Sequence, residues 1–148
     1  MKNVIITLMA VGLFVLVGCG APQPEHKEMA DSVEDMVGIW HRVGGASDAY
    51  GDYAQYLEDG TWLGCAETPD MLGELACQGQ FWFEGTQYFQ KEDLASGCVA
   101  EAGVYEVHLQ PNGNHKFVMV EDKCTGRAYV LQGRISFGED NVEWELVP

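Results

Sequence analysis

Positive charge is scarce in this chain. Its 148 residues include eight lysines and arginines against 23 aspartates and glutamates, so the formal net charge is −15 at pH 7. A surface of that sign repels the phosphate backbone of nucleic acids and the anionic head groups of bilayers. We therefore expect no nucleic-acid binding, and no membrane adhesion that depends on charge.

Sequence motifs of the common catalytic and metal sites are also lacking. The chain has no G-x-S-x-G, no H-E-x-x-H, no phosphate-binding or dinucleotide-binding loop and no calcium-loop spacing. A zinc site is disfavoured because no CxxC occurs and no histidine lies at ligand spacing from a cysteine. His108 and His115 flank an expected hairpin and could meet across it, but both lie on the polar side of their alternation, so we expect both to be solvated. The sequence thus predicts no catalytic residue, no metal site and no cofactor.

One long apolar run stands at the N-terminus. It extends from Val4 to Val17, follows Lys2, and ends in Leu16-Val17-Gly18-Cys19. A short positive start, an apolar stretch too short to span a bilayer comfortably and small residues at its end predict an export signal. The segment resembles a bacterial lipoprotein signal, which implies cleavage before Cys19 and acylation of its thiol. Two acyl chains give stable anchoring, so the lipid bilayer is the expected partner of Cys19. An ordinary signal peptide with an incidental cysteine is the alternative.

Three regions follow from this interpretation: a signal peptide at 1–18, a lipidated cysteine and flexible tether at 19–35, and one barrel domain at 36–148. Residues 20–28 are polar and without periodicity, a leash that would hold the domain on the order of 15 to 20 Å from the membrane. Apolar residues at helical spacing in 29–37 predict one or two helical turns. The residue directly after Cys19 is Gly20, whereas an aspartate at that position would resemble an inner-membrane retention signal. We therefore expect the cell envelope, at the periplasmic face of the outer membrane if the source is Gram-negative.

The cysteines support the same compartment. Without Cys19 an even set remains, and exported chains oxidise such sets into disulfides. Three pairings are possible, and the sequence alone does not choose between them. We favour Cys65–Cys77, which brackets a loop-like stretch, and Cys98–Cys124, which joins segments flanking an expected hairpin.

Short β patterns follow one another from residue 38 onward. Turn residues such as Asp59-Gly60 separate runs of alternating apolar and polar side chains. The expected strands are 38–43, 53–58, 61–65, 80–84, 87–91, 104–110, 116–121, 127–137 and 142–146. Mostly short turns leave no helical crossover for parallel pairing. Eight or nine strands therefore predict an all-β, antiparallel, up-and-down barrel after a short N-terminal helical segment.

Several motifs resemble the lipocalin-like (calycin) superfamily. They are the G-x-W of Gly38-Ile39-Trp40, the hairpin YLEDGTW at 56–62 and the segment FVMVEDKCTGR at 117–127. The resemblance covers roughly residues 36–147. It implies a barrel closed at one end by Gly38 and Trp40, with Arg127 or Arg134 packed across the tryptophan ring. The T-D-Y motif has no clear counterpart, and the domain is short, so no C-terminal helix is expected. Members of the superfamily are mostly carriers of small apolar molecules.

Aromatic side chains fall in most of the expected strands. They predict either a filled core or the lining of an apolar pocket. The candidate pocket residues are Tyr56, Trp62, Phe83, Tyr105, Phe117 and Tyr129. In the pairs Trp82-Phe83 and Tyr88-Phe89 neighbouring side chains point to opposite faces, so an outer aromatic patch is expected.

We therefore expect a lipid-anchored barrel that binds or carries a small hydrophobic ligand. The alternative is a solidly packed, non-enzymatic protein-interaction or inhibitor module, whose partner the sequence does not identify. An enzyme that uses the cavity is a third, weaker interpretation.

Overall fold

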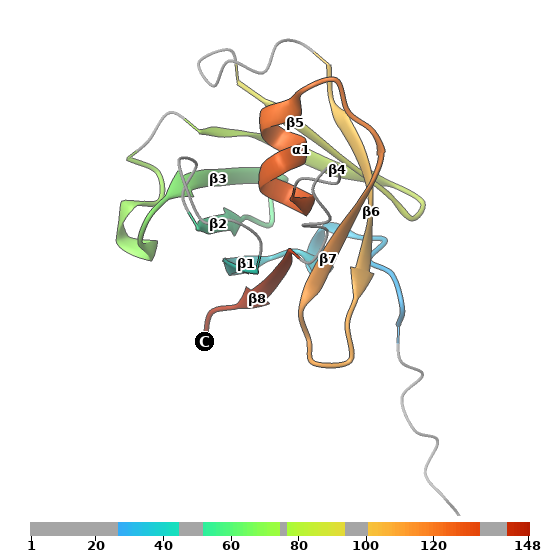
Figure 1. Cartoon of the computed structure of the whole chain (residues 1–148), viewed down its shortest axis with the longest axis horizontal. Coiled ribbons are helices and arrows are strands. Elements are labelled where there is room, and N and C mark those ends of the chain that lie inside the picture. The colour runs from blue at the N-terminus through green and yellow to red at the C-terminus, as the bar shows by residue number, and fades with distance from the viewer. Residues whose placement is uncertain (1–26, 45–51, 75–76, 94–100, 134–141) are drawn as a thin grey trace, which may run out of the picture.

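The computed structural model describes residues 27–44, 52–74, 77–93, 101–133 and 142–148. In these ranges the chain forms eight strands, two 3-10 turns and one α-helix. The strands pair in chain order into a closed barrel in which each is antiparallel to its neighbours, and β8 returns to β1 (Figure 1). The predicted all-β, up-and-down barrel is confirmed.

Most of the expected strands are present with shifts of one or two residues at their ends. The observed strands are β1 (Gly38–Val43), β2 (Tyr53–Tyr56), β3 (Thr61–Ala66), β4 (Gln78–Glu84), β5 (Gln87–Glu92), β6 (Gly103–Leu109), β7 (His115–Glu121) and β8 (Glu143–Leu146). The 3-10 turns are η1 (Val33–Asp35) and η2 (Pro69–Met71). The helical segment expected at 29–37 is therefore reduced to the single turn η1.

The strand expected at 127–137 is wrong, because Thr125–Gln132 form the helix α1. The extended residue Cys124 precedes it, and its Sγ accepts a hydrogen bond from the backbone N–H of Arg127 at 3.4 Å. Gly133 ends the helix with φ at 87°, a left-handed value that favours glycine. The buried residues of α1 are Arg127, Leu131 and Gln132, a helical spacing that the β-forming Tyr129 and Val130 conceal in the sequence.

The two ends of the barrel differ in their connections. At one end, here called the hairpin end, short turns join β2 to β3, β4 to β5 and β6 to β7. Helix α1 lies at the other end, here called the helix end (Figure 1). There the Tyr129 ring lies 5.4 Å from the Arg42 guanidinium carbon, and the indole N–H of Trp144 donates to the carbonyl of Leu131 at 3.2 Å. Helix α1 therefore docks against β1 and β8 at this end.

The start of the domain lies at the hairpin end. The indole N–H of Trp40 donates to the carbonyl of Met36 at 2.7 Å, and both side chains are buried. Gly38 has φ at 145°, a backbone conformation that strains any other residue, and a Cβ there would displace the Leu146 side chain, whose Cδ1 would lie 2.6 Å away. That Gly38 and Trp40 close this end of the barrel stays a prediction.

Candidate functional site

Aromatic rings in mutual contact occupy the barrel interior. Tyr88, which is fully buried, is surrounded by five rings at centroid distances between 5.3 and 6.4 Å: Tyr56, Phe81, Phe83, Tyr105 and Phe117. Phe117 in turn contacts Trp144 at 6.4 Å. Most of these pairs are edge-to-face, the arrangement that the charge distribution of aromatic rings favours. The rings therefore form one packed cluster that crosses the barrel.

The residues predicted to line a pocket belong largely to this packing. Tyr56, Tyr105 and Phe117 are at most 2 % exposed, and Phe83 packs against them partly buried. Trp62 is buried, and its indole N–H donates to the carbonyl of Lys91 at 3.4 Å. Tyr129 does not lie on a strand, because it belongs to α1. The strand-borne candidates are thus brought together as core residues.

A buried cluster of charged residues lies next to the rings, at the helix end. The Arg127 guanidinium binds the Asp122 carboxylate through two hydrogen bonds, Nε to Oδ2 at 2.6 Å and Nη2 to Oδ1 at 2.7 Å. Its Nη1 donates to Glu92 on β5, and its Nη2 also donates to the carbonyl of Glu101 at 3.2 Å. The Tyr105 hydroxyl donates to the same Asp122 carboxylate. Each of the three guanidinium nitrogens thus has an acceptor within the fold.

This cluster corrects one expectation and adds two residues. The described polar contacts of Arg127 are with the Asp122 and Glu92 carboxylates and the Glu101 carbonyl and not with the Trp40 ring, and the other candidate, Arg134, lies outside the described residues. Glu92 and Asp122 are functional candidates that the sequence did not indicate. The sequence offered one weak signal, and it concerned Glu92. This residue occupies an inward position of β5, in line with Tyr88 and Gln90, where a charged residue is unusual.

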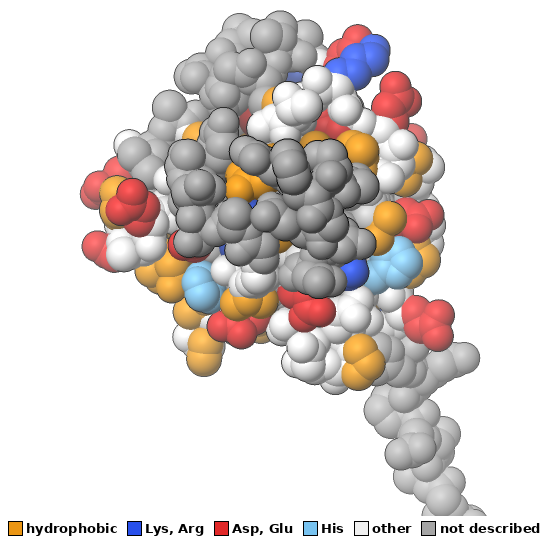
Figure 2. All heavy atoms as spheres, viewed as in Figure 1, with side chains coloured by type: hydrophobic (Ala, Val, Ile, Leu, Met, Phe, Trp, Pro, Cys, Tyr) orange, Lys and Arg blue, Asp and Glu red, His pale blue; other side chains and the backbone are white. Residues whose placement is uncertain are grey.

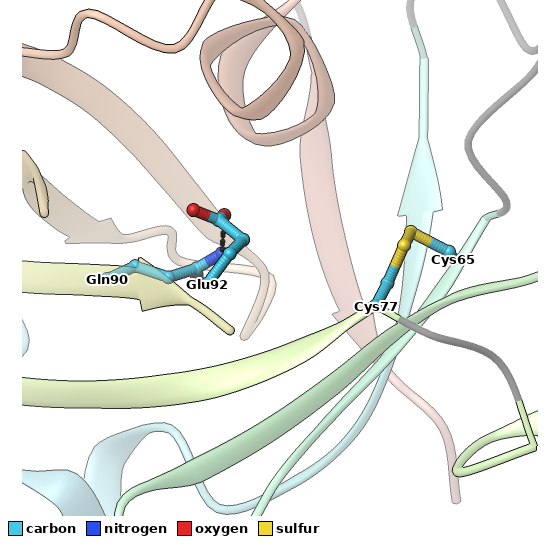
Figure 3. The surroundings of a disulfide bond; sticks show 4 residues. All are labelled: Cys65, Cys77, Gln90 and Glu92. Atoms are coloured by element: carbon cyan, nitrogen blue, oxygen red, sulfur yellow. Dashed lines mark hydrogen bonds between the residues drawn. A yellow bond between two sulfur atoms is a disulfide. The ribbon is translucent and has the colours of Figure 1, made fainter. Parts of the chain in front are cut away.

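Hydrogen bonds extend the cluster along β5. The Tyr88 hydroxyl donates to Gln90 Oε1 at 2.5 Å, and the Gln90 amide donates to Glu92 Oε1 at 3.4 Å (Figure 3). Burial raises the pKa of Tyr56, Tyr88 and Tyr105 well above the ordinary value, so these phenols remain protonated hydrogen-bond donors.

Electrostatics separates the two carboxylates. Burial raises the pKa of Glu92, and the neighbouring Arg127 offsets only part of that shift. Burial also acts on Asp122, but hydrogen bonds from Arg127, Tyr105 and the Cys124 backbone N–H outweigh it and lower its pKa. The pKa of Arg127 is raised, because its two carboxylates outweigh its burial. The arrangement suits a structural lock better than proton transfer, since Asp122 and Arg127 are both held in their charged forms.

His115 occupies the place expected for an arginine. Its ring stacks on Trp40 with the centroids 3.9 Å apart, and it is 4 % exposed. The prediction that His115 is solvated is therefore wrong, because in the register Leu109 and His115 pair with both side chains on the inner face. Burial lowers its pKa to about 4, so the ring is neutral near pH 7. His108 pairs with Lys116 and is part-exposed, so the histidines lie on opposite faces.

One predicted disulfide is confirmed. Cys65 on β3 is bonded to Cys77, which precedes β4, and their Cα atoms are 5.6 Å apart (Figure 3). Cys124 is also disulfide-bonded, but its predicted partner Cys98 lies outside the described residues, so that pairing stays a prediction. The lipidation site Cys19 lies outside them as well.

The outer surface carries the expected aromatic patch. Trp82 on β4 and Phe89 on β5 point away from the barrel interior and stack with centroids 5.3 Å apart. Carboxylates are spread over the face seen in Figure 2, where basic side chains are few. In the described ranges no group of three or more potential metal ligands comes together, and no helix there is long and apolar enough to cross a membrane.

Comparison with known proteins adds no relative: the chain matches no family model, no curated protein and no solved structure.

Proposed function

We propose that this protein is a lipid-anchored, non-enzymatic binding module of the cell envelope that acts through its outer surface. The observation that carries the proposal is the ring cluster around Tyr88, in which side chains of the chain itself take the place of an apolar ligand. A second observation supports the proposal: at the helix end the Arg127 guanidinium forms ion pairs with Asp122 and Glu92 of the chain itself.

Probe binding tests the occupied interior. The wild-type domain is titrated with fatty acids, retinoids and haem while tryptophan fluorescence is recorded. We expect no saturable quenching, because the rings around Tyr88 already contact one another. The variant Phe117→Ala, titrated with benzene, serves as the positive control, since an apolar cavity of that kind admits small apolar guests such as benzene. Saturable binding by the wild type, weakened by substitutions around Tyr88, would contradict the proposal.

The anchor rests on the N-terminal sequence and has its own test. We expect the wild-type protein in the membrane fraction, resistant to extraction by salt, with the mass of an acylated N-terminal cysteine. The variant Cys19→Ser should lose both the acyl mass and the membrane fraction. Unchanged fractionation of Cys19→Ser would contradict lipid anchoring while leaving the ring cluster unaffected.

A carrier function is the second candidate, and one feature of α1 favours it. Two of the three buried side chains of this helix, Arg127 and Gln132, are polar, so polar contacts contribute much of what holds it on the barrel, beside the apolar contacts of Leu131 and Val130. A cover held by ion pairs can open over a site that the closed state hides. The same titration distinguishes the two functions, because the wild-type protein should bind one of the probes saturably if it is a carrier.

A further inference from the structure

The outer side of β4 to β7 carries five apolar side chains, here called the apolar face: Trp82, Phe89, Val104, Val118 and Val120. In the register, Trp82, Phe89 and Val104 lie side by side on three neighbouring strands. Val118 and Val120 lie on β7, where Glu106 pairs with Val118 and Glu121 with Val104. They are 39 % and 51 % exposed, which makes them two of the three most exposed large apolar residues of the described ranges. Exposed apolar groups that adjoin one another mark interaction surfaces.

Two residues of the apolar face have distinct surroundings. Val120 lies at a register irregularity between β6 and β7, where Val104 pairs with Glu121 and Tyr105 with Met119. Val120 continues the outward alternation of Lys116 and Val118, and the bulge leaves Glu121 exposed beside it. The indole N–H of Trp82 donates at 3.3 Å to the exposed Glu84 carboxylate, whereas those of Trp40 and Trp144 donate to buried backbone carbonyls. Trp82 therefore has an apolar ring beside a solvent-facing polar end, the combination that suits the membrane–water interface.

We propose that the apolar face docks on the surface of the bilayer that holds the lipid anchor. This inference rests on the anchoring of Cys19 proposed above. The segment that leads to the anchor pairs with β6: the Leu109 N–H donates to the Glu28 carbonyl and the Ala30 N–H to the Val107 carbonyl, both at 2.9 Å. The chain toward Cys19 therefore leaves the domain along a strand of the apolar face itself.

The length of the leash agrees with this docking. Seven residues lie between Cys19 and Lys27, so eight Cα-to-Cα steps span at most about 29 Å when the chain is fully extended. A strand of seven residues such as β6 is about 20 to 24 Å long. The anchored chain can therefore lay any part of the apolar face on the bilayer, and one anchor raises the effective concentration of a second, weak contact.

Charge selects the lipid. The outer side of β4 to β7 carries Lys91 and Lys116, two of the four described lysines, together with Glu84, Glu106 and Glu121. Mixed charges of this kind do not favour anionic lipid, and the acidic chain as a whole is repelled by it. A second copy of the chain carries the same net negative charge. A zwitterionic head group tolerates both signs, so phosphatidylcholine or phosphatidylethanolamine is the expected surface.

Quenching by brominated lipid tests the proposal on the full lipidated protein. Trp40, Trp62 and Trp144 are at most 7 % exposed, so Trp82 is the tryptophan open to a quencher outside the barrel. The protein is reconstituted in phosphatidylcholine vesicles with brominated acyl chains. We expect the wild type to be quenched, and we expect Trp82→Phe to show at most half of that quenching. This variant keeps the apolar face and loses only the reporter.

Two further variants separate docking from general hydrophobicity. The pair Val118→Ser and Val120→Ser should reduce the quenching at least twofold. Leu146→Ser removes a similarly exposed residue, 53 % exposed, from β8 and should leave the quenching unchanged. Near-ultraviolet circular dichroism confirms that each variant retains its aromatic packing.

Vesicle flotation distinguishes the two failures. Protein that floats with the vesicles but shows no quenching overturns docking and leaves the anchor intact. Protein that does not float contradicts the anchor and the docking together. Shielding of Trp82 from acrylamide that rises with protein concentration in detergent, without lipid quenching, overturns docking and indicates a second copy on this face.

Discussion

Arg127, in the first turn of α1, is bound to Asp122, just after β7, by two parallel hydrogen bonds of 2.6 and 2.7 Å. Two hydrogen bonds fix the guanidinium in the plane of the carboxylate, a geometry that lysine does not reproduce. Because Arg127 also binds Glu92 on β5, one side chain joins the helix to the barrel wall. The side chains of all three residues are at most 5 % exposed.

Replacing Arg127 should strongly destabilise the fold. Arg127→Met leaves two buried carboxylates without their cation, and breaking a buried pair in this way costs about 3 to 5 kcal/mol. Urea unfolding gives the free energy, and hydrogen exchange should show the α1 amides opening first. Lys123→Met is the control, because its ion pair with Glu101 is exposed, and we expect no resolvable change. Equal effects of the two substitutions would contradict the structural role of Arg127.

Buried His115 should make the domain less stable as the pH falls from about 6.5 to about 4. Its folded pKa of about 4 lies below the ordinary 6.5, so in this window the unfolded chain binds a proton that the folded chain refuses. The shift corresponds to about 3 kcal/mol. The raised pKa of Glu92 acts in the opposite direction, because there the folded state takes up a proton before the unfolded one does.

Comparison of the wild type with His115→Phe isolates the contribution of His115. The phenylalanine ring can still stack on Trp40 but does not titrate. Unfolding free energies at several pH values between 4 and 7 should therefore fall more steeply on acidification in the wild type. Parallel pH profiles of the two proteins would show that His115 is not the titrating group.

Two glycine substitutions should have opposite effects. A Cβ on Gly79 would lie 1.9 Å from the carbonyl oxygen of Lys91 and 2.9 Å from Glu92 Cα, so Gly79→Ala forces the backbones of β4 and β5 apart. We expect loss of the folded state or a fall in Tm of more than 10 °C. Gly126→Ala, in the first turn of α1, has only Cys124 Sγ within 4 Å, at 3.9 Å. It should stabilise the domain by about 0.5 to 1 kcal/mol because alanine favours the helix. Thermal unfolding followed by circular dichroism measures both.

The Cys65–Cys77 bond should contribute about 3 kcal/mol, the loop-closure value for cysteines 12 residues apart. The double variant Cys65→Ser and Cys77→Ser tests this by urea unfolding under oxidising conditions. A non-reducing peptide map of the wild type should also show Cys98 linked to Cys124. A Cys124 peptide joined to any other cysteine would contradict the predicted pairing.

Alternation and turn residues were sufficient to predict the barrel from the sequence. A side chain on a strand faces in or out by its position alone, so Trp40, Tyr56 and Phe117 were assigned to the inside correctly. The same rule predicted that one member of each pair, Trp82-Phe83 and Tyr88-Phe89, faces outward; the stack of Trp82 on Phe89 itself was not predicted. Because most of the turns are short, each strand was expected to pair with the next strand in the sequence.

Residues whose surroundings come from distant segments could not be placed. His115 looked polar in its own strand, but the inner side of β7 brings it against Trp40 of β1. Arg127 and Asp122 are near in sequence, whereas Glu92 reaches them only after the barrel closes. Helix α1 was taken for a strand because Tyr129 and Val130 favour strands, and its docking on Arg42 and Trp144 overrides that local preference.

Closure of the barrel ties its folding to the last residues of the chain. Trp40 of β1 pairs with Leu146 of β8, and β8 shares only the pair His115–Trp144 with β7. The β7 edge is also satisfied by α1, where Gln132 Oε1 accepts the Met119 N–H at 2.8 Å. The first strand therefore waits for the final four-residue strand, a long loop closure of the kind that slows folding to milliseconds or longer. Until β8 has formed, one edge of β1 has no strand partner.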